Sequence, residues 1–164
     1  MTRRDARGVT LIEVSIVSAL AMLVVLGMVG FYISSQSSWM AGSSQALAQR
    51  DATLLVETMA DSIRRAAVAV PFDSPDSLRR GVALYDATGT EFWRFWWEAR
   101  DQRVHHGPAV GRDHGPVVNT PVTRFELDTL TRLVVIRLVE MRADDGQTVR
   151  IASAAALYNR AATP

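Results

Sequence analysis

The chain has 164 residues, a length that suits one globular domain, with 48% hydrophobic and 21% charged residues. It has no cysteine, which excludes disulfides, thiolate metal sites and a cysteine nucleophile. All 18 basic residues are arginine, so a catalytic lysine is excluded, and a net charge of +1 gives no basic excess for nucleic-acid binding.

The N-terminal segment is the most apolar part of the chain. Residues 9–33 carry a single charge, Glu13, and as a helix they would measure about 37 Å, enough to cross a hydrocarbon core of about 30 Å. Arginines precede this run, so the positive-inside rule predicts a cytoplasmic N-terminus and a C-terminal part on the outer side. The run is too long for a secretory signal peptide, and no small-residue cleavage site follows it.

A plain membrane anchor explains the length of this run but leaves Glu13 unexplained. A carboxylate inside a spanning segment is costly, so it marks either a functional site or a position near the helix end. The sequence around it, RGVTLIE at residues 7–13, closely resembles the processing site of type IV prepilins and type II secretion pseudopilins. This family usually carries phenylalanine where the present chain has Val9.

The resemblance implies three roles in the N-terminal segment. A prepilin peptidase would cut between Gly8 and Val9 and would then methylate the new amine of Val9. Glu13 would become the fifth mature residue and would set subunit register by pairing with the terminal amine of a neighbouring subunit. A buried charge pair of this kind specifies register more than it stabilises.

Residues 34–70 are predicted to continue the helix. Apolar residues recur at steps of three and four from Leu55 to Val70, which marks one helix face, and Pro71 ends the run. The expected fold is therefore α+β and pilin-like, with a long N-terminal helix, transmembrane in its first half, packed on a small antiparallel β-sheet domain. Its expected segments are the leader 1–8, the transmembrane and filament-core helix 9–33, the amphipathic helix 34–70 and the β-rich domain 71–164.

The hydrophobic period changes to two after a predicted loop at 71–80. Alternation predicts strands at 82–85, 91–97, 123–129, 133–142 and 147–158, with turns at 86–89 and 143–146 and a loop over 105–121. Residues 61–66 and 156–160 loosely resemble the corresponding parts of J-type pseudopilins of type II secretion and W-type minor pilins.

Three tryptophans, Trp93, Trp96 and Trp97, fall within one predicted strand. One interpretation is a core strand packed against the helix. The other is that its outer face docks a neighbouring subunit or cargo, since tryptophan and arginine are typical interface anchors.

Two groups of residues could bind metal ions. His105, His106 and His114 with Asp113 are suitable ligand types, but their spacing is not diagnostic, and solvated loop histidines are the favoured interpretation. Asp144 and Asp145 could contribute to a calcium site, but the following Gly146 favours a hairpin turn. No catalytic spacing is present, so we expect no enzyme activity, no metal and no cofactor.

The resemblance thus implies a minor pseudopilin or minor pilin in the inner membrane, assembled into a type II secretion pseudopilus or a type IV pilus. DNA-uptake pseudopili share the same N-terminus. Its expected partners are the prepilin peptidase, other pilins or pseudopilins, and the inner membrane, with no nucleic acid. The alternative is a single-pass, membrane-anchored ligand-binding or transport accessory protein.

Overall fold

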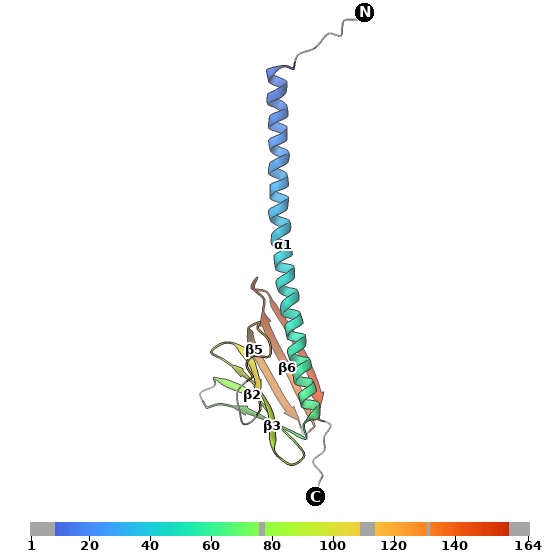
Figure 1. The fold of residues 1–164 in the computed structure, drawn as a ribbon, viewed down its shortest axis with the longest axis vertical. Coiled ribbons are helices and arrows are strands. Elements are labelled where there is room, and N and C mark those ends of the chain that lie inside the picture. Colours follow the sequence, from blue (N-terminus) through green and yellow to red (C-terminus); the bar gives the residue numbers. More distant parts are fainter. Residues whose placement is uncertain (1–8, 76–77, 109–113, 131, 158–164) are drawn as a thin grey trace, which may run out of the picture. The chain divides into compact units, whose positions relative to one another are not determined.

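The computed structural model describes residues 9–75, 78–108, 114–130 and 132–157 (Figure 1). One helix, α1 (Leu11–Arg65), precedes seven strands, which confirms the predicted α+β class with a long apolar N-terminal helix and antiparallel sheets. The strands are β1 (Val68–Asp73), β2 (Arg79–Tyr85), β3 (Glu91–Glu98), β4 (Arg103–Gly107), β5 (Val122–Leu130), β6 (Leu133–Arg142) and β7 (Thr148–Ala156). The chain divides into two compact units, Met1–Met40 and Ala41–Pro164.

The first unit contains the apolar part of α1. Thr10 caps the helix, because its Oγ1 accepts a hydrogen bond of 3.3 Å from the backbone N–H of Glu13. The large hydrophobic side chains from Val9 to Met40 are all at least half exposed. With a mean hydropathy of 2.5 over its most apolar window, α1 is long and apolar enough to cross a membrane.

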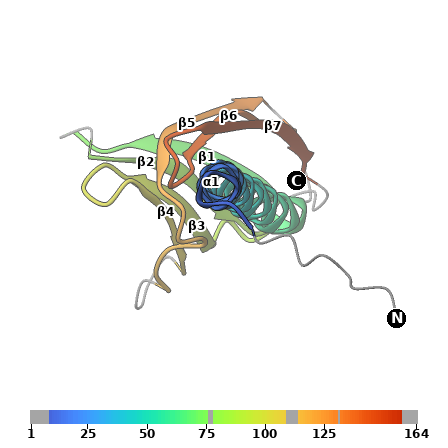
Figure 2. The same cartoon turned by 90° about the horizontal axis from the view of Figure 1, so that it is seen from above.

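The second unit has its core between α1 and two antiparallel sheets, ordered β1-β2-β3-β4 and β5-β6-β7. Figure 2 shows the three-stranded sheet curving over one side of the helix and the four-stranded sheet on another. Side chains of α1 that recur every three or four residues fill the space between them: Ala48, Ala52, Leu55, Val56, Met59, Ala60 and Ile63. All of them except Ala48 belong to one core cluster with the buried sheet residues Val82, Leu84, Phe95, Phe125, Ile136 and Met141.

The helix ends at Arg65, so the prediction that it reaches Val70 was wrong. The N–H of Ala66 still bonds to the carbonyl of Ile63, but the N–H of Ala67 already bonds to the carbonyl of Tyr85 in β2. Residues 68–73 then form the edge strand β1, which includes part of the predicted loop. Pro71 is tolerated there because an edge strand can leave one side of its backbone without a hydrogen-bonded neighbour.

The other strand predictions are mostly confirmed. The predicted strands at 82–85, 91–97 and 123–129 are found in β2, β3 and β5, and β6 has the predicted bounds 133–142. Strand β4 was missed, because the histidines and the glycine at 105–107 indicated a loop. The last predicted strand is observed as β7, which ends at Ala156, and Tyr158 lies outside the described residues.

Candidate functional site

The N-terminal candidate residues lie at the exposed start of α1. Gly8 lies outside the described residues, whereas Val9 is described and is 71% exposed. Glu13 is exposed in the first turn of the helix, and its carboxylate makes no hydrogen bond or ion pair with another described residue. This carboxylate is therefore available as a hydrogen-bond acceptor for a cation from another molecule.

Thr10 is a structural residue that the sequence analysis missed. The pattern Thr10-x-x-Glu13 is typical of a helix capping box, and one half of that box is observed as the bond from the Glu13 N–H to Thr10. A carboxylate in the first turn is also favourable beside the positive end of the helix dipole. The start of the helix thus favours an acidic residue at position 13, independently of the role that the prepilin motif implies.

The three tryptophans of β3 lie on both faces of the four-stranded sheet. Trp97 joins the two sheets, since its Nε1–H donates a 2.7 Å hydrogen bond to the carbonyl oxygen of Val122 at the start of β5. The guanidinium carbon of Arg80 lies 5.4 Å from the centre of the Trp97 ring, in a cation–π arrangement. Both contacts place Trp97 in the structural framework of this unit.

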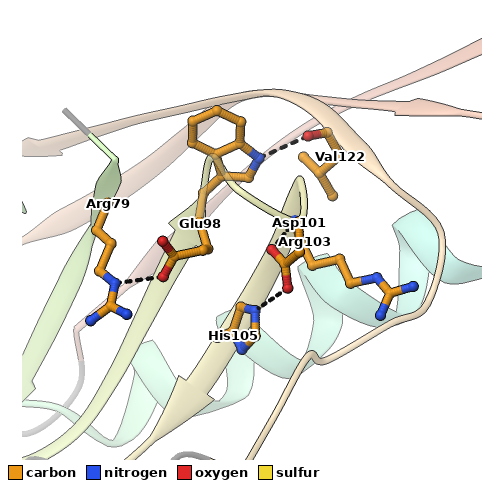
Figure 3. Close-up of polar contacts among 7 residues, drawn as sticks. Arg79, Glu98, Asp101, Arg103, His105 and Val122 are labelled. Carbon is orange, nitrogen blue, oxygen red and sulfur yellow. Dashed lines mark hydrogen bonds and ion pairs between the residues drawn. The ribbon is translucent and has the colours of Figure 1, made fainter.

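Trp96 lies on the opposite face of the strand and is only 9% exposed. Its ring stacks on His105 of β4, with centroids 5.7 Å apart and an angle of 17° between the planes. The histidine Nε2 lies 2.8 Å from a carboxylate oxygen of Asp101, and Arg79 pairs with Glu98 at 2.5 Å on the same sheet (Figure 3). The stack with His105 and the low exposure of Trp96 leave little of its ring for a partner.

Trp93 belongs to the same face as Phe95 and Trp97. It makes edge contacts with His106 and His114, whose ring centroids lie 5.5 and 5.1 Å from that of Trp93. Its indole N–H is buried and has no hydrogen-bond acceptor among the described residues. Of the three tryptophans, Trp93 and Trp97 are part-buried and Trp96 is buried.

The histidines do not converge on one point. His106 and His114 contact each other beside Trp93, with centroids 5.7 Å apart. His105 instead stacks on Trp96, on the other face of the sheet. Asp113 lies outside the described residues. Within the part of the chain that the structure describes, no three histidine or acidic side chains are placed to hold a metal ion together.

The turn between β6 and β7 is confirmed as a hairpin. The Gly146 N–H bonds to the carbonyl of Ala143, and Gly146 has a positive φ of 84° that a glycine adopts without strain. The Asp145 carboxylate accepts the N–H of Gln147 at 2.9 Å. Asp145 therefore has a role in forming the turn itself.

A hollow of about 600 Å³ lies between the edge of β1 and strand β5, and the sequence analysis did not predict it. Its walls combine apolar side chains with charged ones, and Asp128 and Arg137 form an ion pair of 2.6 Å within it. The lining residues are Pro71, Phe72, Asp73, Arg80, Gly81, Phe125, Glu126, Leu127, Asp128 and Arg137. Such a lining suits a small mixed polar and apolar ligand.

Two carboxylates in this unit have lowered pKa values. The Arg150 guanidinium, 2.6 Å away, lowers the pKa of Glu140, and the hydroxyl of Thr123 contributes. The hydroxyl of Thr88 and backbone N–H groups of the turn lower the pKa of Asp86. Both groups stabilise strand connections, and neither lines the hollow.

Comparisons with protein-family models, with curated proteins and with solved structures give no match to this chain.

Proposed function

We propose that this protein is a minor pseudopilin or minor pilin subunit, anchored in the inner membrane and assembled into a type II secretion pseudopilus or a type IV pilus. The observation that carries the proposal is the sequence RGVTLIE, which lies directly before and within the first turn of α1. The exposed apolar surface of Val9–Met40 supports it, because that surface needs a membrane or other helices to cover it.

In this proposal the protein is a substrate and a building block. The prepilin peptidase cuts between Gly8 and Val9 on the cytoplasmic side and methylates Val9. The apolar part of α1 stays in the inner membrane until the subunit joins sister pilins. Residues 41–164 lie on the outer side, where their surface would contact neighbouring subunits.

Mass spectrometry of the membrane-bound protein tests the proposal. In cells with an active prepilin peptidase, we expect an N-terminus at Val9, heavier by one methyl group if the amine is modified. Gly8→Ala should slow or block the cut, because the cleaved bond follows Gly8, while Ala6→Ser should be processed normally. An intact Met1 terminus in the presence of the active peptidase would refute the pilin assignment.

The hollow between β1 and β5 favours a second candidate, a membrane-anchored ligand-binding or transport accessory protein. Its ion-paired Asp128 and Arg137, next to the apolar Phe72 and Leu127, could orient a small polar ligand. This candidate predicts an unprocessed N-terminus. It also predicts that a bound metabolite raises the unfolding temperature of the wild-type protein but not that of Arg137→Ala.

A further inference from the structure

Trp39 is a large aromatic side chain in a polar stretch of α1. We infer that its indole lies in the lipid headgroup layer on the outer side of the membrane, so that the membrane contact of α1 continues past Ile33 to Trp39. The inference deepens the proposed function and rests on its single-span anchor. The partner it names is a lipid surface.

Packing among the described residues gives no reason for this tryptophan. Trp39 is 78% exposed and the adjacent Met40 is 63% exposed. The first buried residue of α1 is Ala48, more than two helical turns further along the chain. A tryptophan exposed in this way is better placed at a membrane boundary, where its apolar ring and polar N–H each find a suitable environment.

The length of the helix places Trp39 at that boundary. From Leu11 to Trp39, a rise of 1.5 Å per residue gives about 42 Å, whereas a bilayer with its headgroups measures about 40–45 Å. Arg3, Arg4 and Arg7 precede the helix and favour the cytoplasmic side for its start. Helical side chains also lean toward the N-terminus, which directs the indole back toward the lipid.

The intervening serines are compatible with the headgroup layer. The hydroxyls of Ser37 and Ser38 both donate 2.9 Å hydrogen bonds to the carbonyl of Ser34, so these polar groups are satisfied within the helix. No charged residue lies between Glu13 and Arg50. Arg50 follows Trp39 by about 16 Å of helix, which leaves this layer free of fixed charge.

Tyr32 provides a second aromatic group on the same side of the helix. It is 66% exposed and precedes Trp39 by seven residues, which is almost two full turns. Tyrosine and tryptophan are the residue types enriched at membrane interfaces. Lipid is therefore the favoured cover for this face, and a second protein chain is the competing outcome that the experiment separates.

The test uses the full chain in vesicles of phosphatidylcholine with a minor fraction of phosphatidylglycerol. Bromine atoms are attached to the lipid chains either near the headgroups or near the bilayer centre, and tryptophan fluorescence is compared between wild type and Trp39→Phe. Shallow bromine should remove about half of the intensity that Trp39 contributes, because an indole at headgroup level lies within its reach. Deep bromine should remove much less. Trp39→Phe is a suitable control because it leaves Trp93, Trp96 and Trp97 unchanged.

Flotation of the vesicles tests the membrane anchor separately from the placement of Trp39. If the protein does not float with the vesicles, the membrane anchor is wrong and this inference fails with it. If it floats but shallow bromine quenches wild type and Trp39→Phe equally, only the placement of Trp39 is overturned. The placement of Trp39 would also be overturned if aqueous acrylamide strongly quenched the fluorescence that Trp39 contributes, or if crosslinks formed from position 39 to a second copy of the chain.

Single cysteines provide an independent measurement, because the chain has no cysteine of its own. In the same vesicles, Ser34→Cys should be protected from a water-soluble maleimide and Gln49→Cys should react fully. The boundary between protected and reactive positions should lie around Trp39. Full reactivity of Ser34→Cys would show that the membrane contact ends near Ile33, which would contradict the inference.

Discussion

Glu13 is the only charged side chain from Val9 to Gln49, and its role depends on what approaches it. Within the chain, Thr10 uses its own side chain to cap the helix through the backbone N–H of Glu13. Replacing the glutamate side chain therefore leaves this cap in place. The carboxylate itself can be tested separately from the helix start.

The proposed pilin function predicts that Glu13→Gln is cleaved and inserted normally but enters the filament poorly. Without the carboxylate, a neighbour's terminal ammonium has no counter-charge, which costs about 3–5 kcal/mol for a fully buried pair and less where water or headgroups reach it. Crosslinking to sister subunits should fall at least about tenfold, which needs only about 1.4 kcal/mol. Glu13→Asp keeps the charge and should assemble better than Glu13→Gln. Normal crosslinking in Glu13→Gln would leave only a role at the helix end.

Gly81 is required by close packing of two backbones. It lies opposite Trp96 in the β2–β3 register, and a Cβ atom there would collide with the carbonyl oxygen of Phe95 and the Cα of Trp96. Gly81→Ala should lower the free energy of unfolding by about 1–3 kcal/mol, the usual cost of overpacking. Gly42→Ala is the control: nothing lies within 4 Å of the added Cβ, so the free energy should stay equal or rise by up to about 1 kcal/mol. Denaturant unfolding in detergent, followed by tryptophan fluorescence, measures both. Equal stability of the two variants would contradict the proposed clash.

At the scale of elements, Glu140 connects all three strands of its sheet. From β6 it accepts hydrogen bonds from Arg150 on β7 at 2.6 Å and from the Thr123 hydroxyl on β5 at 3.1 Å. These contacts lower its pKa below the ordinary value of 4.5. The folded state therefore binds this proton less readily than the unfolded state does, and the bonds stabilise the fold only while Glu140 is ionised.

The pH dependence of stability follows from the sign of this shift. The contribution of Glu140 should be complete above its ordinary pKa of 4.5 and should disappear as the pH falls through the lower pKa of the folded state. Glu140→Gln should thus unfold at a lower temperature than wild type near neutral pH, and the difference should shrink in acid. Thermal unfolding measured across this pH range tests the prediction. Because Arg150 is exposed, high salt should reduce the difference as well. A difference that stayed constant with pH would contradict the role of the charge.

At the scale of the whole molecule, the two sheets depend on α1 for their core. Leu55, Met59 and Ile63 are fully buried, and they contact residues from both sheets. Asp51 adds a polar link, since its carboxylate accepts a 2.6 Å hydrogen bond from the Thr120 hydroxyl. The amphipathic half of α1 is therefore an integral part of the β-rich unit.

We predict that residues 37–164 form a soluble unit that unfolds cooperatively, because this fragment keeps the whole of Ala41–Pro164 and removes the apolar span. Residues 66–164 lack the helix and should be aggregated or largely unfolded, since the inner faces of both sheets would be exposed. Circular dichroism and analytical ultracentrifugation compare the two fragments. A folded 66–164 fragment, or a disordered 37–164 fragment, would contradict this account of the core.

The sequence by itself determined the features that depend on local composition. Uninterrupted apolarity predicted the span-length helix, period-two alternation predicted β2, β3, β5 and β6, and Asp145-Gly146 predicted the last hairpin. Each of these signals is local, because it arises from neighbours along one face or within one turn. The motif at residues 7–13 is equally local, and the function it implies stays a prediction.

Only the tertiary structure decided where α1 ends, that residues 105–107 belong to a strand, and which face of β3 packs into the core beside α1. Residues 68–70 fit a helical period, but they form an edge strand in which pairing with β2 satisfies their backbone. The hydrophobic period alone does not distinguish these two conformations. The His105–Trp96 stack and the hollow at β1 and β5 join segments distant in the chain. Such contacts depend on strand register, which is fixed only when both sheets close over the helix.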